Sequence, residues 1–155
     1  MNKTNVMRLL ESQGIPYQPF DYTKSHAVSA DEVAKALNED PLKVFKTLVT
    51  VGKSREHYVF VVPSTSELDL KKAAKASDEK NIEMITQKEL LPLTGYIHGG
   101  CSPIGMKKKF LTFVDESALK FPKIYISGGR VGLQVQVNPQ DLEKITGCQF
   151  TDLCL

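Results

Sequence analysis

The most pointed candidate for chemistry is Lys46, a lysine inside an apolar run. The run reads Val44-Phe-Lys-Thr-Leu-Val49, where a short helical turn meets a predicted strand. A lysine in such a place can extend its ammonium to solvent from the strand edge. Alternatively, the ammonium lies in a pocket, where a low dielectric strengthens its attraction for a carbonyl or phosphate oxygen. Lys46 is therefore either a solvated lysine or a positioned cation.

A second candidate is the glycine-rich stretch His98-Gly-Gly-Cys-Ser-Pro-Ile-Gly105. Glycines let the backbone approach a ligand closely, and consecutive N–H groups can bind a phosphate or an ester oxyanion. The stretch departs from two known motifs at one position each. Met106 stands where a P-loop needs lysine, and Ile104 stands where a nucleophile elbow needs glycine. The stretch is either a ligand-binding loop or an ordinary turn.

Cys101 follows His98 by three residues, which raises the hypothesis of a cysteine nucleophile with a histidine base. Catalytic pairs are usually assembled from distant segments, however, and no acidic residue in the loop could orient the imidazole. The sequence favours Cys101 as a small loop side chain over a catalytic thiol.

A second glycine-rich turn, Ser127-Gly-Gly-Arg-Val-Gly132, lies between two predicted strands. Hairpin chemistry alone explains its two consecutive glycines. Together with Lys46 and the first glycine-rich loop, the turn also fits a cleft built from backbone amides. Tyr22 could add a phenolic hydroxyl to that cleft or serve only as a core or rim aromatic.

Helices and strands that would position these residues follow from periodicity, capping signals and turn residues. Capping boxes begin helices at Ser29 and Thr86, and Gly14 ends the first helix. Pro16 and Pro19 restrict the first strand to a sheet edge. Predicted helices lie at 6–10, 29–37, 66–76, 86–89 onward and 139–145, and predicted strands at 15–22, 46–51, 57–62, 82–85, 96–98, 110–114, 124–127 and 133–137. This order favours an α+β fold with an antiparallel or mixed sheet.

Composition limits the class of protein. The chain has 155 residues, 41% of them hydrophobic, and a formal net charge of +2, which indicates one globular domain over residues 1–155. Three cysteines without metal-ligand spacing fit a reducing cytoplasm. No segment has the length of a signal peptide or a membrane span, so we expect a cytoplasmic protein with no membrane association.

Charge is concentrated in residues 98–130, which carry six basic and two acidic side chains. This segment is a candidate contact surface for a phosphate backbone, with a solvated lysine face as the alternative. Its basic residues are Lys107, Lys108, Lys109, Lys120, Lys123 and Arg130.

Five pieces, in order along the chain, together resemble the YbaK/EbsC family. They are Val44–Val49, Leu68-Asp-Leu-Lys-Lys72, Thr94-Gly-Tyr96, Gly99–Gly105 with its Ser-Pro centre, and Ser127-Gly-Gly129. The family consists of aminoacyl-tRNA deacylases related to the editing domain inserted in bacterial prolyl-tRNA synthetases. The likeness is greatest to the branch that removes cysteine mischarged onto proline tRNA.

The resemblance implies an α+β fold with a mixed, barrel-like sheet flanked by helices, and neither metal nor other cofactor. It implies hydrolysis of the ester between an amino acid and the 3′ end of tRNA. In the cysteine branch the substrate's own thiol attacks the ester carbonyl, and Lys46 matches the lysine that holds the substrate.

The resemblance also assigns further residues. The amides of Gly99, Gly100 and Cys101 would face the carbonyl. Tyr22, Thr47, Ser127, Gly128 and Gln136 would bind the substrate. From the clustering of charge, we expect Lys107, Lys108, Lys109 and Arg130 to contact the tRNA backbone. Mischarged tRNA is the expected partner, with prolyl-tRNA synthetase as a possible second one, and the oligomeric state stays open.

The sequence departs from the family pattern in two regions. Val28 or Ser29 replaces an aromatic residue, and Gln134 and Gln136 stand where acidic residues are common. Either difference could shift the accepted amino acid, for example toward alanine. The alternatives are therefore an Ala-tRNA(Pro) deacylase and a non-catalytic module that binds tRNA or a synthetase.

Overall fold

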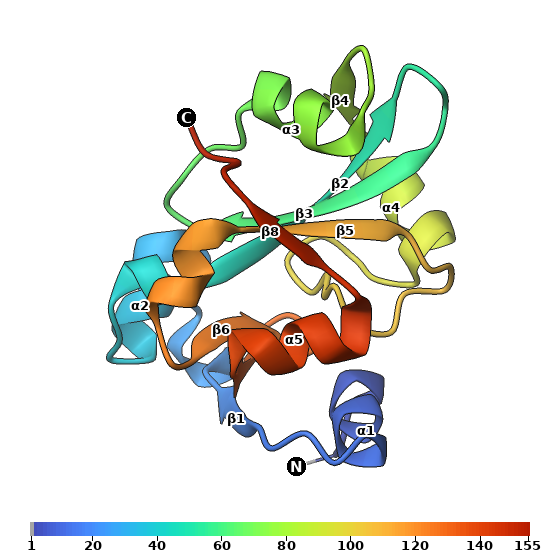
Figure 1. Ribbon diagram of the computed structural model, residues 1–155. Coiled ribbons are helices and arrows are strands. Elements are labelled where there is room, and N and C mark those ends of the chain that lie inside the picture. The colour runs from blue at the N-terminus through green and yellow to red at the C-terminus, as the bar shows by residue number, and fades with distance from the viewer. Residues whose placement is uncertain (1) are drawn as a thin grey trace.

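Two β-sheets and five α-helices make up the fold in a computed structural model that describes residues 2–155 (Figure 1). The helices are α1 (Asn5–Ser12), α2 (Ala30–Ala36), α3 (Leu70–Ser77), α4 (Gln87–Thr94) and α5 (Pro139–Thr146). The strands are β1 (Gln18–Asp21), β2 (Phe45–Gly52), β3 (His57–Pro63), β4 (Ile82–Met84), β5 (Leu111–Asp115), β6 (Ile124–Ser127), β7 (Leu133–Val137) and β8 (Gln149–Thr151). Short 3₁₀ turns lie at Thr23–Ser25, Pro41–Lys43 and Glu116–Lys120.

The smaller sheet has three antiparallel strands in the order β1-β7-β6. The larger sheet has the order β4-β2-β3-β5-β8 and is mixed, because β5 runs parallel to both β3 and β8. One parallel bridge, between Val44 and Tyr125, links the two sheets. The expected α+β fold with a mixed sheet is therefore confirmed. Within residues 2–155 the two sheets do not close into a barrel.

Three apolar clusters hold these layers together. The largest joins α1, α5 and residues of both sheets, and it contains Phe45, Val61 and Val135 among its buried members. A second lies between the larger sheet and α3, and a third lies under α2. Figure 1 shows α3 on the far side of the larger sheet from α1 and α5. The larger sheet is therefore covered on both faces.

Local capping explains where several helices begin. The capping box of Ser29 and Glu32 is present, as is the one at Thr86 and Glu89. The predicted helix at 66–76 begins only at Leu70, because the Asp69 carboxylate accepts hydrogen bonds from the Lys71 and Lys72 amides.

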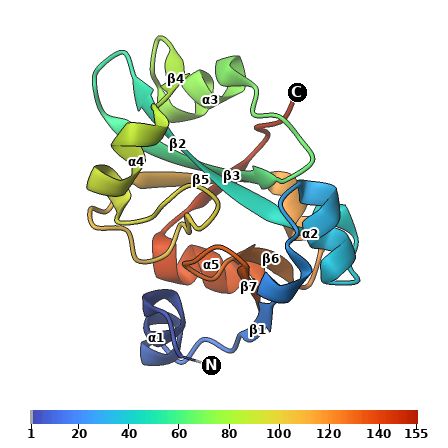
Figure 2. The same cartoon turned by 180° about the vertical axis from the view of Figure 1, so that it is seen from behind.

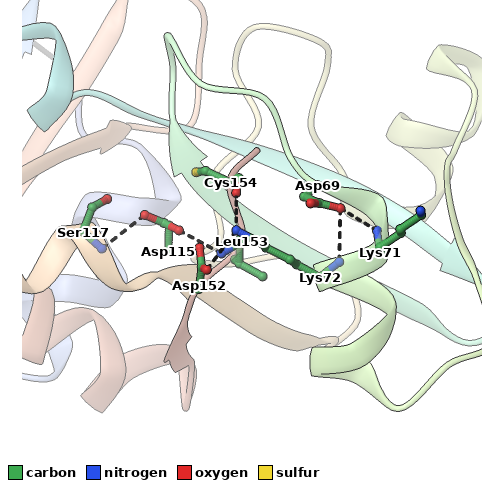
Figure 3. A network of polar contacts seen from close by, with 8 residues as sticks. All are labelled: Asp69, Lys71, Lys72, Asp115, Ser117, Asp152, Leu153 and Cys154. Atoms are coloured by element: carbon green, nitrogen blue, oxygen red, sulfur yellow. Dashed lines mark hydrogen bonds and ion pairs between the residues drawn. The ribbon is translucent and has the colours of Figure 1, made fainter.

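Most predicted strands are present, with two differences. No strand forms at 96–98, since the Tyr96 amide donates to the Thr94 hydroxyl at 3.0 Å and His98 and Gly99 form a turn. The strand β8 was not predicted. Its three residues follow Gly147 and pair with β5, and the carboxylate of Asp115 on β5 also binds the Leu153 amide just beyond β8 (Figure 3).

No helix within residues 2–155 combines the length and apolar character that crossing a membrane requires.

Candidate active site

A cavity of about 480 Å³ lies where the two sheets and α2 meet. We call it the central cavity. Its wall is formed by the first half of β2, the loop before α2, the segment from β4 into α4, the His98–Cys101 loop, and residues of β6 and β7. The volume is within the range of small-molecule sites, which commonly measure about 300–1,000 Å³. Of the residues predicted for substrate binding or catalysis, Lys46, Tyr22, Thr47, Gly99, Cys101 and Ser127 line it.

The β2 strand brings Lys46 and Thr47 to this cavity at an open sheet edge. The Ser64 amide donates a hydrogen bond to the Val44 carbonyl, and the Gly52 amide donates to the Glu56 carbonyl. The backbone groups of the even-numbered residues of β2 therefore point toward β3. The other edge pairs with β4 only from Thr50 onward. In Figure 2, β2 crosses the sheet from α2 toward the hairpin next to β4. Lys46 and Thr47 can therefore reach one cavity from opposite faces of the strand.

Lys46 is half-buried and makes no ion pair with an acidic group of residues 2–155. Its nearest strand neighbour is Val62 on β3, an apolar residue. A half-buried ammonium without an internal counterion can attract an oxygen atom of a bound molecule.

Two polar atoms in the cavity wall lack partners among residues 2–155. They are Thr47 Oγ1 and Gln134 Oε1, both buried. Buried polar atoms of folded proteins nearly always have hydrogen-bond partners, and exceptions are often found at functional sites. The amide nitrogen of Gln134 donates to the Tyr22 hydroxyl at 3.4 Å, which places both side chains on one wall.

The glycine-rich loop is held firmly beside the cavity. Tyr96 donates a hydrogen bond to the Ile104 carbonyl, and the Ile104 amide donates to the Ser102 hydroxyl at 3.2 Å. Gly99 has φ +87°, a left-handed conformation that favours glycine. Gly99 and Cys101 line the cavity, whereas the Gly100 amide donates to the Ile97 carbonyl at 3.0 Å and serves the loop itself.

Cys101 is a poor nucleophile in this position. Burial raises the pKa of its thiol to about 12, so the reactive thiolate is scarce at neutral pH. His98 lies exposed at the cavity, and no hydrogen bond joins it to Cys101 in the part of the chain that the structure describes. This geometry offers no cysteine–histidine pair.

Gly128 and Gln136, also expected at the substrate, lie outside the cavity wall. The Gly128 amide donates to the Leu133 carbonyl at 2.9 Å within the β6–β7 turn. Gln136 pairs with Tyr125 across the sheet and donates to its hydroxyl at 3.2 Å. Gln134 pairs with Ser127 and lines the cavity instead. The length of the hairpin turn sets this register, and it could have identified Gln134 from the sequence.

The basic residues predicted for the tRNA backbone differ in environment. Lys107, Lys108 and Lys109 are exposed. Arg130 instead forms an ion pair with Asp21, with 2.9 Å between Nη2 and Oδ2. Its guanidinium is therefore engaged by an acidic group of the protein.

Val28 and Met84 contribute to the apolar part of the wall, from the loop before α2 and from β4, and both are exposed. Val28 is one of the positions at which the sequence departs from the family pattern. Met84 is not indicated by any local pattern, because a separate segment brings it to the cavity.

Comparison with known proteins indicates the family of this chain. Residues 24–145 match the family described as the aminoacyl-tRNA editing domain. The chain is 44% identical to EbsC of Enterococcus faecalis, named as a candidate Cys-tRNA(Pro)/Cys-tRNA(Cys) deacylase, over 97% of this chain and 93% of that protein.

Solved structures share the fold. A candidate trans-editing enzyme for prolyl-tRNA synthetase is similar with a TM-score of 0.83 and 27% identity, covering 99% of both chains. A hypothetical protein, APE2540, is similar with a TM-score of 0.89 and 22% identity, covering 98% of this chain and 100% of that one, and shows the fold alone. The matched family model and the relative at 44% identity each span most of the molecule, and this chain belongs to the aminoacyl-tRNA editing domain family.

Proposed function

We propose that this chain is a trans-editing deacylase that removes cysteine from cysteinyl-tRNA(Pro), acting as one domain over its 155 residues. The observation that carries the proposal is Lys46, a half-buried lysine at the central cavity that makes no ion pair with any acidic group among residues 2–155. Membership of the editing family and the name of the Enterococcus faecalis relative support the ester of a mischarged tRNA as the substrate.

In the proposed reaction the substrate supplies the nucleophile. The cysteine sulfur forms a bond to its own ester carbonyl carbon, the bond from that carbon to the ribose oxygen breaks, and the thiol proton ends on the ribose oxygen. Water then opens the resulting cyclic thioester to free cysteine. The net reaction is hydrolysis of one ester bond, and it needs no nucleophile from the protein.

The protein contributes position and electrostatics. Lys46 would attract the ester or a nearby ribose or phosphate oxygen, and the Gly99–Cys101 backbone would lie beside the carbonyl. The unpartnered oxygens of Thr47 and Gln134 could accept hydrogen bonds from the substrate ammonium. Holding reacting groups in a productive geometry can lower a barrier by about 7–11 kcal/mol in favourable cases.

A cavity of about 480 Å³ accommodates the aminoacyl end of a tRNA and little more. Recognition of the tRNA body would therefore come from the surface around it and from a partner. We propose prolyl-tRNA synthetase as that partner, because a structurally similar protein is described as a candidate trans-editing enzyme for it.

The test is a panel of mischarged tRNAs incubated with the wild-type chain. We expect release of cysteine from cysteinyl-tRNA(Pro) well above the spontaneous rate, and slower release of alanine from alanyl-tRNA(Pro). Faster release of alanine would identify an alanyl-tRNA deacylase. Binding without release of any amino acid would contradict an enzymatic role and indicate a tRNA-binding module.

A further inference from the structure

The turn between β6 and β7, residues 128–132, contacts two separate walls of the central cavity. One is the segment Asp21–Thr23, which carries Tyr22. The other is the glycine-rich loop that carries Gly99 and Cys101. A turn that touches both walls can set the distance between them.

Contacts with the first wall surround Tyr22. Arg130 Nη2 lies 2.9 Å from Asp21 Oδ2, and Arg130 Nη1 lies 3.4 Å from Thr23 Oγ1. The Tyr22 amide donates to the Gly132 carbonyl at 2.8 Å. Arg130 thus binds the residues on either side of Tyr22, and the turn binds its backbone.

Contacts with the second wall are equally close. A Cβ atom on Gly100 would lie 3.0 Å from Arg130 Cα and 3.1 Å from the Val131 nitrogen. A Cβ on Gly99 would lie 3.4 Å from the Val131 side chain. The loop therefore packs directly on the backbone of Arg130 and Val131.

We propose that Arg130 is a positioning residue, whose ion pair with Asp21 holds Tyr22 at a fixed distance from the Gly99–Cys101 loop. This inference rests on the proposed function, because it assigns Arg130 a role in the same reaction. It replaces the expectation that Arg130 contacts tRNA phosphates. Hydrogen bonds from Thr23 and then Arg130 hold the pKa of Asp21 well below its usual range, so its carboxylate is ionised at neutral pH.

The half-exposed pair contributes little to stability, which separates positioning from folding. The experiment compares Arg130→Ala, Asp21→Ala and the exchanged double variant Asp21→Arg with Arg130→Asp. Arg8→Ala is the control, because it removes an exposed arginine of α1. Measured quantities are kcat and KM for cysteinyl-tRNA(Pro), and the affinity for uncharged tRNA across salt concentrations.

We expect both single variants to lower kcat about tenfold with unchanged tRNA affinity, because small displacements of positioned groups are costly. The exchanged variant should recover part of the rate. A phosphate contact would behave differently: Arg130→Ala would weaken tRNA binding and flatten the salt dependence, while Asp21→Ala would leave kcat unchanged or tighten binding. That result would overturn the proposal.

Hydrogen exchange gives a readout that does not depend on activity. The Tyr22 amide, bonded to Gly132, should exchange faster in both single variants and regain protection in the exchanged one. An unchanged Tyr22 amide in both single variants would overturn the positioning role even if the chain is a deacylase. An inactive wild type with these exchange changes would instead reject the proposed function, while the structural role of the Arg130–Asp21 pair in holding Tyr22 would stand.

Discussion

Cys101 illustrates how environment decides what a residue can do. The residue lines the central cavity beside Gly99 and is 8% exposed. Burial raises its pKa to about 12, so at pH 7 only about one thiol in 100,000 is ionised. Lys46 differs, since it is half-buried and makes no ion pair with the acidic groups of residues 2–155. The environments of the two side chains favour the cation over the thiol as the group that acts on a ligand.

Replacing Cys101 by alanine should therefore leave deacylation of cysteinyl-tRNA(Pro) within about twofold of wild type. The reason is that the protonated thiol supplies no nucleophile. Steady-state rates of both proteins, with circular dichroism to confirm folding, measure this. A folded Cys101→Ala protein that has lost activity would instead establish a cysteine hydrolase.

The Cys101 thiol should also make the free energy of unfolding depend on pH in the alkaline range. The thiol has a pKa near 9 in the unfolded chain and about 12 in the folded one. Between these values the unfolded chain has lost a proton that the folded chain retains, so the free energy of unfolding falls as pH rises. The slope from this group is about 1.4 kcal/mol per pH unit, and it vanishes below pH 9.

Urea unfolding at pH 8 and pH 10, with reductant present, compares wild type with Cys101→Ala. Wild type should lose about 1.4 kcal/mol more than the variant between these two values. Cys154, whose pKa is raised to about 11 by burial and by the nearby Asp115, is common to both proteins and cancels in the difference. Equal losses would show that Cys101 titrates normally.

At the scale of elements, the sequence patterns predict the helices and strands that neighbouring residues determine. The capping box at Ser29 and the hairpin strands β6 and β7 follow from neighbouring residues, and the structure contains them. The strand β8 depends on its pairing with β5, a partner far away in the sequence. The choice of Gln134 over Gln136 at the cavity differs from this case, because the register of the β6–β7 hairpin follows from the length of its turn. Elements and site residues that rest on long-range pairing could not be read from one sequence.

Asp115 anchors the C-terminal segment that local patterns missed (Figure 3). Its buried carboxylate accepts hydrogen bonds from the Leu153 amide at 2.9 Å and the Ser117 amide at 3.1 Å. Burial tends to raise its pKa, but these hydrogen bonds outweigh that effect and lower it. Lys72 adds an ion pair to Asp152, with 2.8 Å between Nζ and Oδ2, on the surface beside it.

We predict that Asp115→Ala lowers the free energy of unfolding by about 1–3 kcal/mol, since it leaves the buried Leu153 amide without an acceptor. The matched control, Asp152→Ala, removes an exposed carboxylate and should cost less than about 1 kcal/mol. Denaturant unfolding measures both. Similar losses in the two variants would contradict the role of Asp115 as the anchor.

At the scale of the whole molecule, a net charge of +2 conceals an uneven distribution. Lys107, Lys108 and Lys109 form an exposed run just after the glycine-rich loop that borders the cavity. A separate exposed set, Lys71, Lys75 and Lys80, lies on and just after α3. Figure 1 shows α3 across the larger sheet from α5. We predict that a tRNA with its acceptor end in the cavity contacts the first set rather than the second.

Changing Lys107, Lys108 and Lys109 together to glutamine should weaken tRNA binding and flatten its dependence on salt. Each lost phosphate contact lowers the slope of log affinity against log salt by about 0.7–0.9. The control changes Lys71, Lys75 and Lys80 to glutamine, an equal loss of charge, and should leave the slope close to wild type. Equal slopes in the two variants would reject the run as the contact surface.

The central claim is that Lys46 positions the ester of cysteinyl-tRNA(Pro) for cleavage. The most direct measurement is single-turnover release of cysteine by wild type, Lys46→Ala and the control Lys53→Ala, which removes an exposed lysine of the β2–β3 turn. A charge-assisted hydrogen bond contributes about 1.5–3 kcal/mol, so Lys46→Ala should slow release by about 10- to 150-fold while Lys53→Ala stays at the wild-type rate. Release by a folded Lys46→Ala protein at the wild-type rate would contradict the claim.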